Sequence, residues 1–366
     1  MSTDNTAAIT ARRKGLWSAA WTRDLRTARI VRFATGVTFA AAVAFAIEWP
    51  LSFLVPVLTA VFLAMPLPGP TPQQVLSNIF YVLGAFALGL VFTLLLLPFP
   101  LIYVPLLGLS LFHIYYLLNR GGPFMLVLMC ILAVLILPMM SQAHDVLASG
   151  FTTGFVWSGS LAIALVWLAH AVFPDPSAQR QAPAPHRFPT GYSAPAAEAA
   201  LKSTIVVLPV ATLFIASEWS GQILVMVFIA IFSLSPELAK GQAAGIKSLK
   251  STIAGGLAAL VFYHILIVVP EYHFFIALML LTALLFAVNI FSNKPTAAYY
   301  PSAFTALLIL VSTSMGEGAD FGEKFVMRVI YIAAATIYVV LALIVLERYW
   351  PARYPVLETG RCSKQR

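Results

Sequence analysis

Residues 29–50 read RIVRFATGVTFAAAVAFAIEWP, an apolar run with two arginines, Arg29 and Arg32, at its start and a Glu-Trp pair near its end. A helix needs about 20 predominantly apolar residues to cross a lipid bilayer, so this run predicts a transmembrane helix. Residues 199–220, AALKSTIVVLPVATLFIASEWS, show the same pattern 170 positions later, with Lys202 in the place of Arg32. A membrane helix that recurs with its polar ends in register predicts a duplicated membrane protein.

The composition extends this expectation to the whole chain. Of the 366 residues, 60% are hydrophobic and only 10% are charged, and the mean hydropathy is +0.90. A soluble domain carries about 25% charged residues. So few charges cannot cover a surface that faces water, which means that most of the surface faces lipid. The sequence therefore predicts an all-α integral membrane protein whose first partner is the lipid bilayer.

Apolar runs bounded by proline, glycine or charge give twelve candidate transmembrane helices, six in each half of the chain. Two of them, 51–66 and 221–236, are short for a full crossing, and the sequence leaves open whether they span the bilayer. The twelve candidates cover about 29–47, 51–66, 75–97, 101–118, 124–140, 148–172, 199–217, 221–236, 246–269, 273–291, 300–315 and 325–346.

A stretch rich in proline and alanine separates the two sets of helices and has no apolar period, which is typical of a linker. The predicted organisation is a basic N-terminal arm (1–28), a first six-helix repeat (29–172), the linker (173–198), a second six-helix repeat (199–347) and a basic tail (348–366).

The positions of Lys and Arg predict the orientation. Of the 22 such residues, 20 fall on one face of the twelve-helix topology. Cytoplasmic loops of membrane proteins carry an excess of Lys and Arg, so we expect the N-terminus, the linker and the C-terminus to be cytoplasmic. Orientation and contact with anionic lipid headgroups also explain the net charge of +8, so no nucleic-acid partner is required.

The duplication keeps one register across four helices. A shift of 170 places Pro100 on Pro270 and Asn119 on Asn289 without a gap, and the offset grows to 177 near the end of each half. Six helices per unit preserve the orientation of the chain. We therefore expect two parallel repeats, related by an axis along the membrane normal.

The residues that enzymes use do not occur in the arrangements that catalysis needs. The six histidines are scattered, and the two cysteines, Cys130 and Cys362, lack metal-ligand spacing. The sequence contains no Gly-rich phosphate loop and no nucleophile elbow. We expect no enzymatic activity, no metal and no cofactor.

Polar residues at membrane depth are costly and are therefore candidates for a substrate path. Glu48 and Glu218 are either interface anchors or a symmetric pair of acids that flank a pore mouth or relay protons. Arg328 either extends outward toward Glu323 or Asp320 or attracts an anion. Arg120 and Lys294 are either orientation signals or anion contacts at the inner mouth. The full candidate set is Arg328, Arg120, Lys294, Arg32, Lys202, Glu48, Glu218, Asn119 and Asn289.

The basic arm leads into a helix that ends in Glu48-Trp49-Pro50, followed by an apolar segment containing Pro56 and a Pro/Gly turn at 66–70. With the six-helix duplication, this pattern resembles the fusaric-acid-resistance and aromatic-acid-exporter superfamily of bacterial inner-membrane proteins, and within it a compact branch whose function is not established. The resemblance implies export of small amphipathic carboxylic acids and a periplasmic adaptor (membrane fusion) protein as partner. The chain departs from such exporters in having a linker of about 25 residues where they carry a sizeable cytosolic domain.

Two functions follow as hypotheses. The first is an inner-membrane transporter, either an exporter or channel-like, of small organic acids that include aromatic ones. The second is a non-transporting membrane scaffold or an assembly subunit of an export complex.

Overall fold

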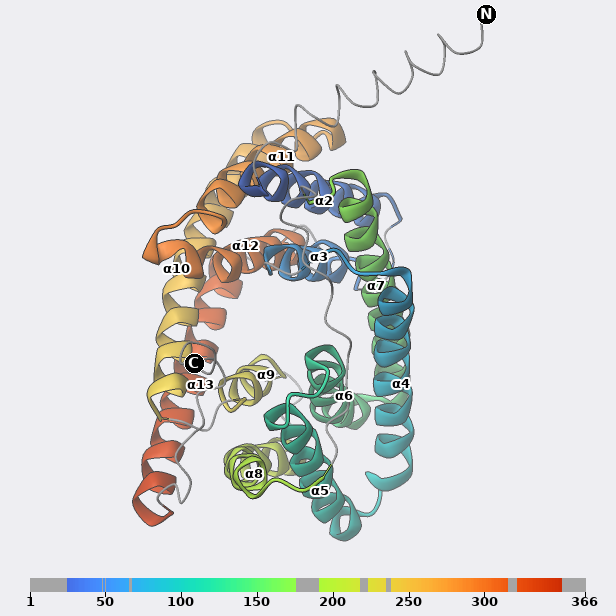
Figure 1. Ribbon diagram of the computed structural model, residues 1–366, viewed down its shortest axis with the longest axis vertical. Coiled ribbons are helices and arrows are strands. Elements are labelled where there is room, and N and C mark those ends of the chain that lie inside the picture. Colours follow the sequence, from blue (N-terminus) through green and yellow to red (C-terminus); the bar gives the residue numbers. More distant parts are fainter. Residues whose placement is uncertain are drawn as a thin grey trace, which may run out of the picture. The chain divides into compact units, whose positions relative to one another are not determined.

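The computed structural model describes residues 25–47, 49, 51–65, 68–175, 191–217, 223–234, 238–314 and 321–350. Within these ranges the chain is helical and has no β-strand (Figure 1). The helices are α2 (Leu25–Ile47), α3 (Leu54–Ala64), α4 (Pro72–Leu96), α5 (Pro100–Asn119), α6 (Phe124–Ala143), α7 (Asp145–Val172), α8 (Ala194–Ala216), α9 (Ile223–Phe232), α10 (Leu238–Val268), α11 (Tyr272–Ile290), the 3-10 helix η3 (Pro295–Tyr299), α12 (Tyr300–Ser314) and α13 (Phe321–Tyr349).

Nine of the described helices are long and apolar enough to cross a membrane. They are α2, α4, α5, α6, α7, α8, α10, α11 and α13. A helix satisfies its own backbone hydrogen bonds, which is why repeated apolar runs of this length become helices in lipid. The prediction of an all-α, multi-pass membrane protein is confirmed.

The remaining three α-helices are shorter. The sequence predicts spans over 51–66 and 221–236, but α3 has 11 residues and α9 has 10. At a rise of 1.5 Å per residue, each is about 15–17 Å long, roughly half of the 30 Å hydrocarbon core. Over the described residues neither helix is long enough to cross the bilayer, so the structure does not confirm twelve full spans. The third, α12, has 15 residues and continues directly from η3.

The chain divides into two compact units, and each unit takes residues from both halves of the sequence. Unit 1 consists of residues 1–84, 149–185 and 247–329, and unit 2 of residues 85–148, 186–246 and 330–366. The division passes through α4, α7, α10 and α13, so each of these long helices contributes to both units. The two predicted repeats, 29–172 and 199–347, are consecutive in the sequence and do not coincide with the two compact units. The repeats stay a prediction.

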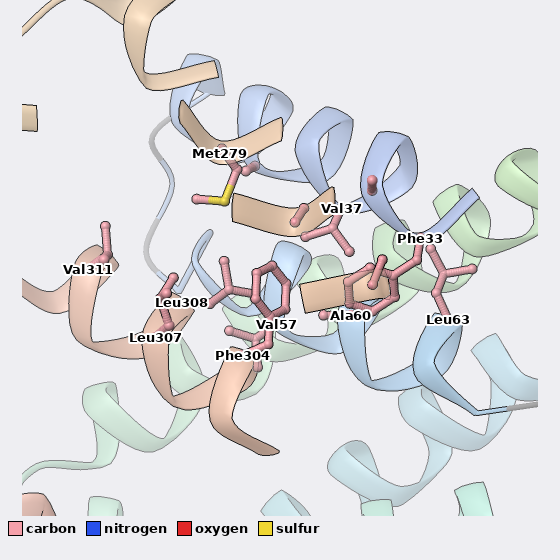
Figure 2. Close-up of a cluster of buried hydrophobic side chains, with 14 of the residues drawn as sticks. Phe33, Val37, Val57, Ala60, Leu63, Met279, Phe304, Leu307, Leu308 and Val311 are labelled. Carbon is pink, nitrogen blue, oxygen red and sulfur yellow. The ribbon is translucent and has the colours of Figure 1, made fainter. Parts of the chain in front are cut away.

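In unit 1, α2 packs against α11 and α3, and α12 packs against both of these. Apolar residues of α2 recur every three or four positions, at Phe33, Val37, Ala41 and Ala44, and so form one buried face. Figure 2 shows Phe33 and Val37 among side chains of α3, α11 and α12. The ring centroids of Phe33 and Phe304 are 5.3 Å apart.

In unit 2, α5 packs most closely against α8, and α6 contacts α5, α8 and α9. The end of the short helix α9 is held by side chains. The Tyr115 hydroxyl donates to the carbonyl oxygen of Ala230 at 3.3 Å, and the Ser203 hydroxyl donates to that of Ser233 at 2.6 Å. Carbonyl groups at a helix end within a bilayer need such donors, because lipid offers none.

Candidate functional site

A cavity of about 320 Å³ lies within unit 1, at the start of the short helix α3. Four aromatic side chains and two serine hydroxyls belong to its wall. The lining residues come from the end of α2, the loop that follows it, the first turn of α3, α11 and α12. They are Ala41, Ala44, Phe45, Trp49, Leu51, Ser52, Phe53, Pro56, Phe275, Met279, Leu308 and Ser312.

A hydrogen-bond chain fixes the loop that lines this cavity. The indole Nε1 of Trp49 donates to Oγ of Ser158 at 2.9 Å, and Oγ of Ser158 donates to the carbonyl oxygen of Leu51 at 3.0 Å. Ser158 belongs to α7 and is fully buried. One serine therefore holds both the aromatic wall and the loop backbone, and it uses its donor and an acceptor lone pair to do so.

Leu51 adopts a backbone conformation that most residues avoid. Its φ of 67° lies in the left-handed region, and it is the single non-glycine residue with a positive φ in the described part of the chain. Such a conformation costs a residue with a Cβ about 1–2 kcal/mol. Strain of this kind persists where surrounding contacts impose it, here the hydrogen bond from Ser158, and it concentrates at functional sites.

The N-terminal end of α3 contributes to the cavity wall through Phe53 and Pro56. Backbone bonds from Leu54 to Leu51 and from Val55 to Ser52 form the turn that precedes the helix. The first turn of a helix carries a partial positive charge from its aligned peptide dipoles. The cavity therefore combines an apolar aromatic wall with an end that favours negative charge.

Arg32 is buried and already has two partners. Its guanidinium group donates to Oδ1 of Asp175 at 2.9 Å and to the carbonyl oxygen of Phe173 at 3.1 Å. The side chains of Arg32 and Asp175 are 4% and 9% exposed. Arg32 thereby joins α2 to the residues that follow α7, which gives this predicted path residue a structural role.

Lys202 is also buried and paired. Its Nζ lies 2.9 Å from Oε1 of Glu198, one turn earlier on α8, and the two side chains are 8% and 12% exposed. This pair lies within one helix and joins no two elements. Neither of the buried cations that the sequence singles out is therefore left without a carboxylate.

Arg120 contacts the residues that lead into α8. Its guanidinium group donates to the Tyr116 hydroxyl at 3.1 Å and to the carbonyl oxygen of Gly191, and it lies 5.8 Å from the centre of the Tyr116 ring. The Tyr116 hydroxyl also accepts a bond from the Ser193 amide at 3.0 Å. Arg120 thus fastens the chain before α8 to the end of α5.

The other predicted path residues lie apart from the cavity. The side-chain amides of Asn119 and Asn289 donate to carbonyl oxygens one turn earlier on their own helices, each at 2.8 Å. Lys294 is exposed at the start of η3, and Arg328 is partly buried on α13. Glu48 and Glu218 lie outside the described residues, so the structure places neither.

The structure therefore groups Arg32, Asn289, Lys294 and Arg328 in unit 1 and Lys202, Asn119 and Arg120 in unit 2. None of these seven lines the cavity. Sequence reasoning missed the residues that do, of which Trp49 gave the clearest signal because it belongs to the recurring Glu-Trp pair. Ser158 gave none, since it is one serine among the apolar residues of a long helix. Within the described ranges no three His, Cys, Asp or Glu side chains gather as metal ligands would.

Comparison with known proteins gives a match to a family model. No curated protein and no solved structure matches this chain. The model, described as a protein of unknown function (DUF2955), matches residues 29–169, a range close to the first predicted six-helix repeat, 29–172. Over this first part, which includes most of α2, all of α3 and Ser158, the chain is similar to that family.

Proposed function

We propose that this protein is a transporter, exporter-like or channel-like, of small organic acids in a bacterial inner membrane, and that aromatic acids are among its cargo. The observation that carries the proposal is the cavity at the start of a helix too short to span the bilayer. In many transporters, substrate sites lie where membrane helices are broken, because the freed helix ends offer polar groups at membrane depth.

The chemistry of the cavity fits an aromatic acid. Phe45, Trp49 and Phe275 supply apolar and aromatic surface for a ring, and the hydroxyls of Ser52 and Ser312 can donate to a carboxylate. The start of α3 adds a partial positive charge. A volume of about 320 Å³ lies within the range of pockets that hold small ligands.

The same proposal includes the duplicated architecture and its orientation. The order of the helices α2–α7 matches that of α8–α13, and the second helix of each set is the short one. Unit 1 combines α2 and α3 with α11 and α12, and unit 2 combines α8 and α9 with α5 and α6. This exchange supports two parallel repeats of six helices, with cytoplasmic termini as the positions of the cations predict.

The resemblance to aromatic-acid exporters supports the choice of cargo and a periplasmic adaptor protein as partner. It enters as analogy, because fold resemblance does not by itself determine function. The ion pairs of Arg32 and Lys202 favour the alternative function, a non-transporting membrane scaffold, because a scaffold needs cations for structure and not for binding an anion. Of the predicted path residues in unit 1, Lys294 is exposed and stays a candidate for guiding an anion.

Flux through reconstituted protein tests the proposal. Liposomes containing the wild-type protein should release radiolabelled benzoate faster than empty liposomes. Ser312→Leu, which places a larger apolar side chain in the cavity, should reduce the flux to the background. Ser160→Leu is the matched control, because Ser160 is half-buried on α7 and does not line the cavity. Wild-type liposomes that release benzoate no faster than empty ones would leave the scaffold hypothesis in place.

A further inference from the structure

Three arginines lie along one face at the start of α2. Arg26, Arg29 and Arg32 are spaced by three residues, so their side chains are neighbours on the helix surface. Like charges at this spacing repel one another. Hydrogen-bond acceptors, carboxylates or solvent can offset this repulsion.

Two of the three have acceptors. Arg26 donates to the carbonyl oxygen of Val288 on α11 at 3.3 Å. Arg32 donates to Asp175 and to the carbonyl oxygen of Phe173. Asp175 supplies one negative charge, and at 2.9 Å from the Arg32 guanidinium it is committed to that residue.

Arg29, between them, differs. Its Nε is shielded from solvent and has no hydrogen-bond partner in the described part of the chain. The positive charge of Arg29 acts on Arg32 and on the imidazole of His170 on α7, so both lie near it. The Nδ1 of His170 already donates to the carbonyl oxygen of Val166 at 2.9 Å. A buried donor without an acceptor is costly and calls for an explanation such as an unseen ion.

We propose that Arg29 is the centre of an oxyanion-binding site that takes a carboxylate or a phosphate group. A guanidinium group presents a planar fork of donors that matches both, and it stays charged at any physiological pH. Among the described residues, the ion pair with Asp175 offsets the charge of Arg32 and leaves that of Arg29. The site lies in the first two turns of α2, an end that we expect near the membrane boundary. The anion comes either from the cargo acid, which rests on the proposed function, or from a lipid headgroup, which does not.

Thermal stabilisation of the purified protein tests the site. The protein in a neutral detergent is titrated with benzoate, inorganic phosphate or dioctanoyl-phosphatidylglycerol at constant ionic strength, and its melting temperature is followed by tryptophan fluorescence. A ligand that binds the folded state raises the melting temperature with its concentration. A rise with benzoate alone assigns the site to cargo, and a rise with phosphatidylglycerol but little with benzoate assigns it to lipid.

The variants decide whether Arg29 is responsible. Arg29→Gln should weaken the stabilising effect about tenfold or more, since it removes charge-assisted hydrogen bonds. Arg26→Gln removes the same charge from the same face of the helix. It should change the stabilising effect of the ligand by a factor of about two or less. If Arg29→Gln does not fold, Arg29→Lys takes its place and should still weaken binding about threefold, because lysine lacks the planar fork.

No stabilisation of the wild type by any of the three compounds would overturn the site. Equal weakening by the Arg26 and Arg29 variants, or unchanged binding in Arg29→Lys when that variant has to be used, would do the same. Loss of benzoate flux in liposomes with stabilisation intact would remove the proposed function and leave the site standing.

Discussion

The short helices α3 and α9 occupy matching places in the order of the chain, yet they are held at opposite ends. In unit 1, Ser158 fixes the loop before α3 through Trp49 and Leu51. In unit 2, Tyr115 and Ser203 bind carbonyl oxygens at the end of α9. The restraint on α3 shapes a cavity wall, whereas the restraint on α9 satisfies backbone groups that lipid would leave without donors.

The two buried cations, Arg32 and Lys202, also differ in whether their contacts join separate elements. Arg32 joins α2 to residues after α7, while Lys202 pairs with Glu198 on its own helix. Arginine can serve two acceptors in fixed directions through its planar fork, and lysine is a compact point charge. Polar contacts thus connect separate elements within unit 1, and the contrast can be tested by removing these contacts one at a time.

The largest effect is expected from Arg32→Ala. It leaves Asp175 buried without its cation and removes a donor from the Phe173 carbonyl, and breaking a buried ion pair costs about 3–5 kcal/mol. Denaturant unfolding in detergent measures the loss. Arg26→Ala is the control, because Arg26 is exposed and its bond to the Val288 carbonyl is long. Equal losses in both variants would show that the Arg32 pair adds nothing beyond charge.

Ser158→Ala should have the next largest effect, about 1–3 kcal/mol, because it leaves the Trp49 indole and the Leu51 carbonyl without their shared partner. Benzoate binding should fall with it, since both residues line the cavity. Trp49→Phe keeps an aromatic ring and the bond from Ser158 to Leu51. Its stability and its benzoate affinity should therefore lie between those of Ser158→Ala and those of the wild type. Full benzoate affinity in Ser158→Ala would show that this hydrogen-bond chain does not contribute to binding in the cavity.

Ser203→Ala probes the opposite end of a short helix. It removes the 2.6 Å bond to the Ser233 carbonyl and should cost about 0.5–1.5 kcal/mol. Benzoate affinity should not change, because neither residue lines the cavity. A stability loss as large as that of Ser158→Ala, accompanied by weaker benzoate binding, would contradict the contrast between α3 and α9.

The smallest effect is expected from Leu51→Gly. Glycine adopts the left-handed conformation without the penalty that leucine bears, and this gain offsets the apolar packing that the leucine side chain provides. The free energy of unfolding should therefore change by less than about 1 kcal/mol. Leu51→Val, with a branched Cβ, should destabilise more than Leu51→Gly does, and the reverse order would show that strain at this position is negligible.

Much of the fold follows from apolar runs. The segment predicted at 101–118 is α5 (Pro100–Asn119), and that predicted at 199–217 is α8 (Ala194–Ala216). Such runs are local, and lipid leaves the helix as the one favourable state. The sequence also shows that 51–66 and 221–236 are short. It does not show that α3 and α9 cover only part of these segments.

The site depends on contacts that no local pattern records. Ser158 and Trp49 are 109 residues apart, and Arg32 is 143 residues from Asp175, which lies in the stretch predicted as a linker. A proline-rich stretch gives no sign that its first acid is buried. Sequence could therefore find Arg32 as a costly cation but could not find the carboxylate that makes it structural.

The division of the chain into units has a consequence for biosynthesis. Unit 1 draws on residues as far as Val329, and Phe33 of α2 packs against Phe304 of α12. While the chain is being translated, α2 and α3 are therefore inserted long before the helices that complete their core exist. During that interval lipid or insertion machinery has to shield the arginines and the short helix, so a ribosome that stalls midway leaves an exposed intermediate for membrane proteases to recognise.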